Sequence, residues 1–246
     1  MFGILLTLLS GLSILIGTII AYILKNSKKL TEFSISLATG VMGALLVIEL
    51  IPESIELLKE SYSITKSILI IIISSLLGIT ILKLLDTFIP DHDHDENINN
   101  ENLFHIGLVS SVALILHNLI EGMAIYSATL TDKSIGILLT LGICLHNIPL
   151  GIMITSTLSK TNKKKTILMI FVISISTLLG GILMFSLNGI INDIVRGVLL
   201  AITGGMILYI ITFEFLPEIR TIKNKKTSII SILIGIIIFL ITLFFE

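Results

Sequence analysis

The sequence predicts an all-α polytopic membrane protein with eight transmembrane helices. Hydrophobic residues make up 54% of the 246 residues and charged residues only 13%, whereas a typical soluble domain has about 25% charged residues. The apolar residues also gather in long runs, and a spanning helix needs about 20 consecutive, mostly apolar residues. Composition and run length together exclude an ordinary soluble domain.

Eight apolar runs are long enough to cross a bilayer, and most of the connections between them are short. The runs are residues 4–24, 33–51, 67–89, 104–126, 134–156, 166–187, 194–216 and 228–245. The longest connection, at about 90–103, is polar and carries His92 and His94 among acidic residues. Because no segment of soluble-domain size remains, we expect a single transmembrane domain over residues 1–246.

The first run begins almost at Met1, with no positive residues before it and no small-residue cleavage site. We therefore interpret it as a retained span rather than a signal peptide. The single cysteine, Cys144, excludes a disulfide framework and a cysteine-based zinc site. The net charge of −1 gives no sign of nucleic-acid binding.

Lysine and arginine are unevenly divided between the two sets of loops, which predicts the orientation. One set holds eleven: Lys25, Lys28, Lys29, Lys160, Lys163, Lys164, Lys165, Arg220, Lys223, Lys225 and Lys226. The opposite set holds four: Lys59, Lys66, Lys133 and Arg196. Cytoplasmic loops carry the excess of positive residues. We therefore expect a multi-pass protein of the plasma or inner cell membrane, with both termini outside and loop 90–103 inside.

The second and seventh spans carry similar motifs. Residues 39–42 (Thr-Gly-Val-Met) lead to Glu-Leu-Ile-Pro-Glu at 49–53, and residues 203–206 (Thr-Gly-Gly-Met) lead to Glu-Phe-Leu-Pro-Glu at 214–218. With eight spans these two run in opposite directions, as in an inverted repeat. We predict a 3+2+3 arrangement, with spans 1–3 and 6–8 as repeats around spans 4 and 5. The alternative is that acidic residues and prolines merely end helices at the interface.

Ionisable side chains lie in the middle of spans four and five. Residues 117–122 read His-Asn-Leu-Ile-Glu-Gly, and residues 146–151 read His-Asn-Ile-Pro-Leu-Gly. A charged residue at the bilayer centre costs roughly 2.5–3.5 kcal/mol on insertion scales, so it is a candidate for function. His117 and Glu121 share a helix face because they are four residues apart, and His146 lies at a similar depth in the next, antiparallel span.

Two imidazoles and a carboxylate suit a borderline divalent metal such as zinc. We therefore expect a metal site at the midplane formed by His117, Glu121 and His146, with Asn118 and Asn147 beside them. The alternative is that these polar side chains only hydrogen-bond neighbouring helices together.

The chain resembles the ZIP (Zrt/Irt-like) divalent metal transporters over essentially its full length. The resemblance rests on the eight spans, the outside termini, the histidine-containing loop after span three and the two His-Asn motifs; residues 146–151 are close to the family's His-Asn-Ile-Pro-Glu-Gly. It implies a binuclear site. The first position would use His117, Glu121 and His146. The second would use Asn118 and Asn147 with glutamates of spans five and six.

Two departures from the family pattern fall on that second position. Leu150 stands where the family has the span-five glutamate, and residues 174–180 of span six contain no glutamate. Because Asn118 and Asn147 are neutral, we expect the second position to be lost or much weakened. By the same resemblance Met42 of span two is a further candidate contact, and a packing methionine is the alternative.

Four more residues are candidates for accessory metal contacts. Glu49 and Glu214 would line the two mouths of the pathway, unless they only mark helix ends at the interface. His92 and His94 would collect metal or hand it on, unless the loop is a disordered acidic connector.

The function that the resemblance implies is import of Zn²⁺, with Fe²⁺ or Mn²⁺ as further substrates, into the cytoplasm by secondary transport with alternating access. We expect no enzyme activity and no prosthetic cofactor; the partners would be the metal ion and the lipid bilayer, without nucleic acid, and a homodimer is left open. One alternative is an intramembrane metal-dependent hydrolase, which would need an activated water and a general base. Another is a degenerate relative that senses metal without transporting it.

Overall fold

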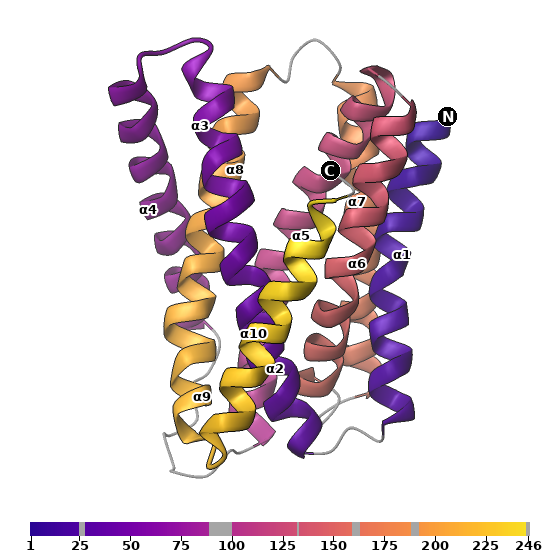
Figure 1. Ribbon diagram of the computed structural model, residues 1–246, viewed down its shortest axis with the longest axis vertical. Coiled ribbons are helices and arrows are strands. Elements are labelled where there is room, and N and C mark those ends of the chain that lie inside the picture. The colour runs from indigo at the N-terminus through magenta and orange to yellow at the C-terminus, as the bar shows by residue number, and fades with distance from the viewer. Residues whose placement is uncertain (25–27, 89–99, 132, 159–162, 188–191, 245–246) are drawn as a thin grey trace.

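The computed structural model describes residues 1–24, 28–88, 100–131, 133–158, 163–187 and 192–244, and within these ranges all regular secondary structure is helical (Figure 1). The helices are α1 (Phe2–Ile23), α2 (Lys28–Ala44), α3 (Ile51–Lys59), α4 (Ile64–Phe88), α5 (Asn100–Thr131), α6 (Lys133–Leu158), α7 (Lys163–Ser186), α8 (Asp193–Tyr209), α9 (Leu216–Thr221) and α10 (Lys225–Thr242). Two π-helical segments, η1 (Leu45–Leu50) and η2 (Ile210–Phe215), join α2 to α3 and α8 to α9.

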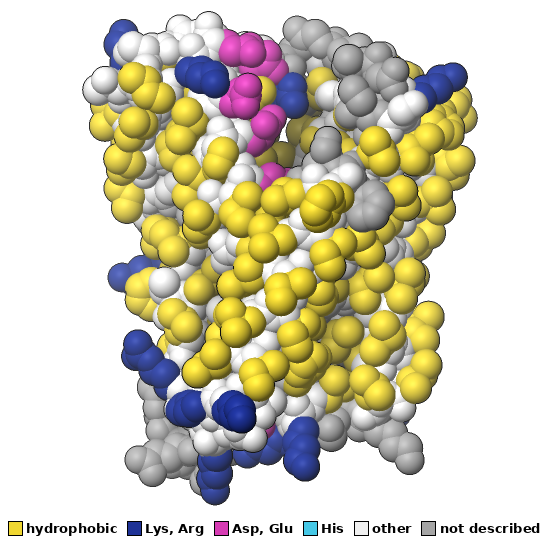
Figure 2. Space-filling model, in the orientation of Figure 1, with side chains coloured by type: hydrophobic (Ala, Val, Ile, Leu, Met, Phe, Trp, Pro, Cys, Tyr) yellow, Lys and Arg dark blue, Asp and Glu magenta, His cyan; other side chains and the backbone are white. Residues whose placement is uncertain are grey.

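The polytopic all-α prediction is confirmed. Seven segments of the described chain are long and apolar enough to cross a membrane, with α2–η1–α3 and α8–η2–α9 counting once each. The 18 residues of α10 add a further apolar helix that packs against α2. On the face shown in Figure 2, hydrophobic side chains cover the middle of the molecule, and most charged side chains lie at its two ends.

Several helices extend beyond the predicted spans. The second and seventh spans continue to Lys59 and Thr221, past their expected ends at 51 and 216. The fourth begins at Asn100, four residues before its predicted start. Polar residues also form helix where a helix projects from the bilayer, so apolar run length underestimates helix length.

One residue separates each π-helical segment from a proline: Ile51 precedes Pro52, and Leu216 precedes Pro217. Pro52 is the second residue of α3, and its ring would collide with the carbonyl four residues earlier in a regular α-helix. The chain instead opens into a wider turn, in which the N–H of Ile51 donates to the carbonyl oxygen of Leu46, five residues earlier. The same pattern recurs before Pro217 in η2.

The helix contacts follow a pseudo-two-fold pattern. Helix α1 packs on α6 as α7 packs on α5, and α4 packs on α8 as α10 packs on α2. Exchanging α1 with α7, α2–α3 with α8–α9, α4 with α10 and α5 with α6 therefore preserves the main contacts. The two π-helical segments, and the prolines after them, are 165 residues apart. The two threonine-to-glutamate spacings in spans two and seven differ by one residue, 39 to 49 against 203 to 214. The 165-residue offset aligns the glutamates and prolines, and it pairs Gly40 with Gly205 instead of Gly204.

Glycines let the paired helices touch through their backbones. A Cβ added at Gly17 or Gly151 would overlap the backbone of the partner helix in the α1–α6 pair, and Gly180 and Gly122 do the same for α7–α5. The α2–α10 and α4–α8 pairs have the equivalent contacts, at Gly40, Gly235, Gly78 and Gly205. Small residues at helix interfaces permit such close packing in membranes.

The result is two helix bundles side by side. Helices α1, α5, α6 and α7 form one, and α2–α3, α4, α8–α9 and α10 form the other, on the right and left of Figure 1. The end of the molecule with Glu53, Arg196 and the N-terminus is called the open end below. The opposite end, with Lys28, Lys163 and Lys223, is called the lysine-rich end.

Candidate metal centre

Three side chains from the two central helices meet at one point. His117 and Glu121 lie one turn apart on α5, and His146 comes from α6. The Nε2 atoms of both histidines are 2.8 Å from the same oxygen, Oε1 of Glu121. One ligand atom from each residue lies within 4.8 Å of the other two. The structure thus brings together the three residues that the sequence spacing and depth suggested.

The three side chains are almost completely shielded from solvent. His117 is 1% exposed, Glu121 5% and His146 0%. A buried carboxylate is costly unless it is paired, and here the two imidazoles face the same oxygen. The second oxygen of Glu121, Oε2, has no hydrogen-bond partner among the described residues. Oε2 of Glu121 can therefore still accept a hydrogen bond or bind an ion.

Asn118 and Asn147 are fully buried beside the histidines. The side-chain N–H of Asn118 donates to the carbonyl oxygen of Ile173 on α7 at 3.2 Å, while its Oδ1 has no partner in the described part of the chain. Neither polar atom of Asn147 has such a partner there. An unsatisfied buried polar group costs about 1–3 kcal/mol, so water or an ion at these amides would be stabilising.

The motifs of α5 and α6 repeat with a constant spacing of 29 residues. His117, Asn118 and Gly122 on α5 are each 29 residues before His146, Asn147 and Gly151 on α6. The same offset places Leu150, which is 1% exposed, opposite Glu121. One carboxylate therefore serves a site whose histidines come in a symmetric pair.

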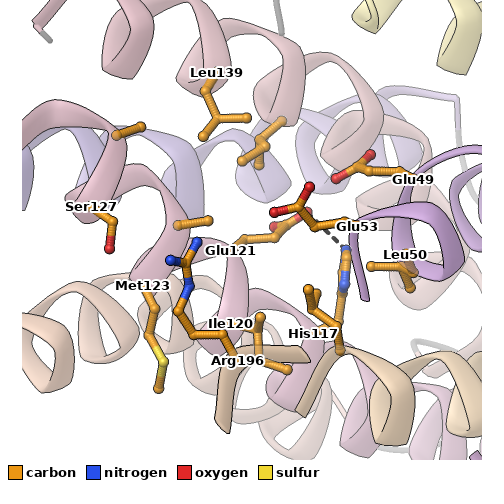
Figure 3. Close-up of a pocket in the computed structure, with 14 residues that line it drawn as sticks. Glu49, Leu50, Glu53, His117, Ile120, Glu121, Met123, Ser127, Leu139 and Arg196 are labelled. Carbon is orange, nitrogen blue, oxygen red and sulfur yellow. Dashed lines mark ion pairs between the residues drawn. The ribbon is translucent and has the colours of Figure 1, made fainter. Parts of the chain in front are cut away.

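A cavity of about 390 Å³ connects the open end with this site. Glu49 of η1, Glu53 of α3 and Arg196 of α8 line it together with His117 and Glu121 (Figure 3). In the close-up the carboxylates and the guanidinium project into the same space, and Figure 2 shows the molecule hollowed at this end, beside acidic side chains. The cavity thus reaches two of the three clustered side chains, His117 and Glu121, from the open end.

Comparison with known proteins gives the family. The model of the family described as ZIP zinc transporter matches residues 90–243, more than half of the chain. The chain belongs to the ZIP zinc transporter family. The zinc transporter ZupT of Clostridium perfringens is 30% identical over 267 aligned positions, which cover 97% of this chain and 94% of that protein. The ZupT of Streptococcus mutans is 29% identical, with 97% and 95% covered.

Membership in the ZIP family confirms the resemblance. It also bears out the expectation that the chain is not an enzyme, because the curated relatives are named as transporters. The hydrolase alternative is therefore set aside.

At the lysine-rich end this ZIP protein has a largely buried ionisable pair that joins the two bundles. Glu214 of η2 corresponds to Glu49 by the 165-residue offset, and its Oε2 lies 3.8 Å from Nδ1 of His105 on α5. The two side chains are 8% and 15% exposed. The structure thus places His105 against an acidic residue of the other bundle.

Buried apolar side chains form one cluster between the two bundles. Leu114, Met153 and Phe215 belong to it, and Met42 is fully buried in the same cluster with Leu150. Met42 thus lies in an apolar environment, and its role as a metal contact stays a prediction. His92 and His94 lie outside the described residues.

Two neighbours of the site were not singled out from the sequence. The sequence places Arg196 only among the loop charges, whereas it lines the cavity and pairs with Asp193 at 2.8 Å. Phe239 of α10 packs against the ring of His146, with 6.2 Å between ring centroids. In the sequence, only the inverted repeat indicates that Phe239 lies near the site, because the repeat packs α10 against the central helices.

Proposed function

We propose that this ZIP protein imports Zn²⁺ into the cytoplasm by alternating access, with His117, Glu121 and His146 as its binding residues. The observation that carries the proposal is a cavity from the open end that reaches a buried set of imidazole and carboxylate ligands. The names of its ZupT relatives support zinc as the substrate.

The ligand set suits a transported ion rather than a permanently bound one. Two imidazole nitrogens and a carboxylate oxygen are typical zinc ligands, and water would complete a tetrahedron. One carboxylate leaves a net positive charge when a dication binds, so we expect modest affinity and release on a transport timescale. Fe²⁺ and Mn²⁺ accept the same ligand types and are secondary candidates.

The excess of lysine and arginine supports a cytoplasmic location for the lysine-rich end. The open end and both termini would then face outside, and metal would enter past Glu49. Release would require the two bundles to shift until the lysine-rich end opens near Glu214 and His105. This arrangement supports an alternating-access cycle in which the present conformation faces outward.

Asn118 and Asn147 are proposed to hold water rather than a second dication. Both amides are neutral, and Leu150 supplies no charge. The unpartnered atoms of Asn147 and Glu121 would hydrogen-bond to water around the single bound ion. Anomalous diffraction at the zinc edge should therefore show one central metal peak; two full peaks would contradict this assignment.

Replacing His117 by alanine tests the proposal. We expect zinc uptake into proteoliposomes to fall by more than about tenfold, since even supporting residues of metal sites change affinity or activity 10–100-fold. Leu116→Ala is the matched control, because Leu116 is 36% exposed on the outer face of the same helix. Normal uptake by folded His117→Ala protein would overturn the site.

A metal sensor is the second candidate, and Leu150 in place of a carboxylate is the feature that favours it. A sensor would bind zinc through His117 and Glu121 but show no uptake in the wild-type chain. Measuring binding and uptake on the same preparation separates the two functions.

A further inference from the structure

A groove of about 370 Å³ runs between α1 and α7, outside the candidate metal centre. Its walls are almost wholly apolar and follow one face of each helix, from Leu8 to Tyr22 on α1 and from Ile167 to Ile175 on α7. Ile167 is 61% exposed and Phe171 58%. The groove is therefore open to the surrounding lipid.

Positive charge lies at one end of this groove. Lys163 and Lys164 precede Ile167 by four and three residues, so they continue the α7 face that lines the groove. Both are exposed, as is Lys165. They occupy the first turn of α7, a 24-residue helix whose N-terminal N–H groups and dipole also favour an anion.

The groove is long enough to hold an acyl chain through one membrane leaflet. At 1.5 Å per residue its α1 wall spans roughly 21 Å and its α7 wall roughly 12 Å, and half of the hydrocarbon core is about 15 Å. Tyr22, 45% exposed, stands at the lysine end, where aromatic side chains mark the membrane interface. The α7 wall therefore fits within one leaflet, the α1 wall reaches a little past the bilayer midplane, and the lysines lie at the membrane surface.

We propose that this groove binds an anionic phospholipid, with one acyl chain between α1 and α7 and the phosphate at Lys163, Lys164 and Lys165. Basic pockets between transmembrane helices are known to bind anionic headgroups. A neutral lipid headgroup would not complement the positive charge at this end of the groove. A second copy of the chain, placed symmetrically on this face, would bring its own lysines against them.

Native mass spectrometry of the purified full-length protein tests the proposal. The probes are phosphatidylglycerol and phosphatidylcholine with identical acyl chains. We expect one phosphatidylglycerol to be retained preferentially. Replacing Lys163, Lys164 and Lys165 by glutamine should weaken that binding roughly a hundredfold and leave phosphatidylcholine binding unchanged.

Two matched controls separate the groove from general effects. The triple variant Arg220→Gln, Lys223→Gln and Lys226→Gln removes the same charge near the α9–α10 junction and should bind phosphatidylglycerol normally. Leu12→Trp should obstruct the groove and weaken the binding of both phosphatidylglycerol and phosphatidylcholine.

Leu9→Trp is the control for that obstruction, because Leu9 faces outward on the same helix without lining the groove; it should have no effect. Equal binding of the two lipids, equal losses in both charge variants, or a dimer that Leu12→Trp dissociates would each overturn the proposal.

Discussion

At the scale of single residues, Glu121 determines what the centre can do. Both imidazoles approach one of its oxygens, while the other has no partner among the described residues. A zinc ion would enter where ring nitrogens and a carboxylate oxygen already converge. The pseudo-equivalent position on α6 is Leu150, which offers no charge.

Leu150→Glu should tighten zinc binding. The new carboxylate would lie one turn from His146, as Glu121 does from His117. At an effective dielectric of 20, two unit charges about 4 Å apart attract by roughly 4 kcal/mol, and a dication doubles the attraction. Burial of the added charge offsets part of this gain, so we expect at least about tenfold tighter binding and slower release, measured by calorimetry and single-turnover uptake.

Leu150→Gln is the control, because it has a similar shape and no charge. Equal affinity in the Glu and Gln variants would mean that residue 150 does not face the ion.

The sequence predicts some residues of the site better than others. His117 and Glu121 follow from helical spacing, and His146 follows from depth. Arg196 does not, because its approach to the cavity depends on how α8 is rotated and on its pairing with Asp193. The contact between His105 and Glu214 likewise depends on how two distant helices pack.

At the scale of helices, the two π-helical segments place acidic residues at equivalent points of the two repeats. Glu49 and Glu214 each lie three residues before the proline that the wider turn accommodates. π-Helical turns are frequent at functional sites. The apolar runs end near these prolines, whereas polar residues continue the helices to Lys59 and Thr221, and run length alone does not reveal the wider turns.

Pro52→Ala should stabilise the protein and slow uptake. Alanine restores a backbone N–H and removes the ring that disfavours a regular helix, which is worth up to about 3 kcal/mol. A regular turn would then redirect Glu49 away from the cavity. Thermal unfolding in detergent and zinc uptake measure the two effects. A lower melting temperature would show that the proline is not the cause of the π-helical segment.

At the scale of the whole molecule, the pseudo-two-fold arrangement is broken between the two ends. Glu49 lines an open cavity, whereas its counterpart Glu214 is buried against His105 on the other bundle. Under the alternating-access cycle proposed above, this asymmetry would correspond to the outward-facing conformation. The contact between α5 and η2 joins the bundles at the lysine-rich end.

Glu214→Ala should favour opening of the lysine-rich end. Ser110 is fully buried on α5, between His105 and His117, so a Ser110→Cys reporter should react slowly with a membrane-impermeant thiol reagent applied from that end. We expect Glu214→Ala to speed the reaction at least about tenfold, corresponding to a shift of 1.4 kcal/mol. Cys144→Ser removes the native thiol from the assay.

Glu218→Ala is the matched control, because Glu218 lies one turn further on, in α9; it should leave the reaction rate unchanged. Equal rates in all three proteins would show that the contact between Glu214 and His105 does not hold this end closed.

The backbone contacts at the glycines also determine when the protein can assemble during synthesis. Gly40 meets Ile232, and Gly17 meets Ile148, so each contact joins segments made far apart in time. At 5–20 residues per second, roughly 10–40 s separate the synthesis of Gly40 from that of Ile232. Until then α2 lies in the membrane without α10, its closest partner on that face. The newly made first half therefore depends on lipid or on the insertion machinery to cover interfaces that only the second half will fill.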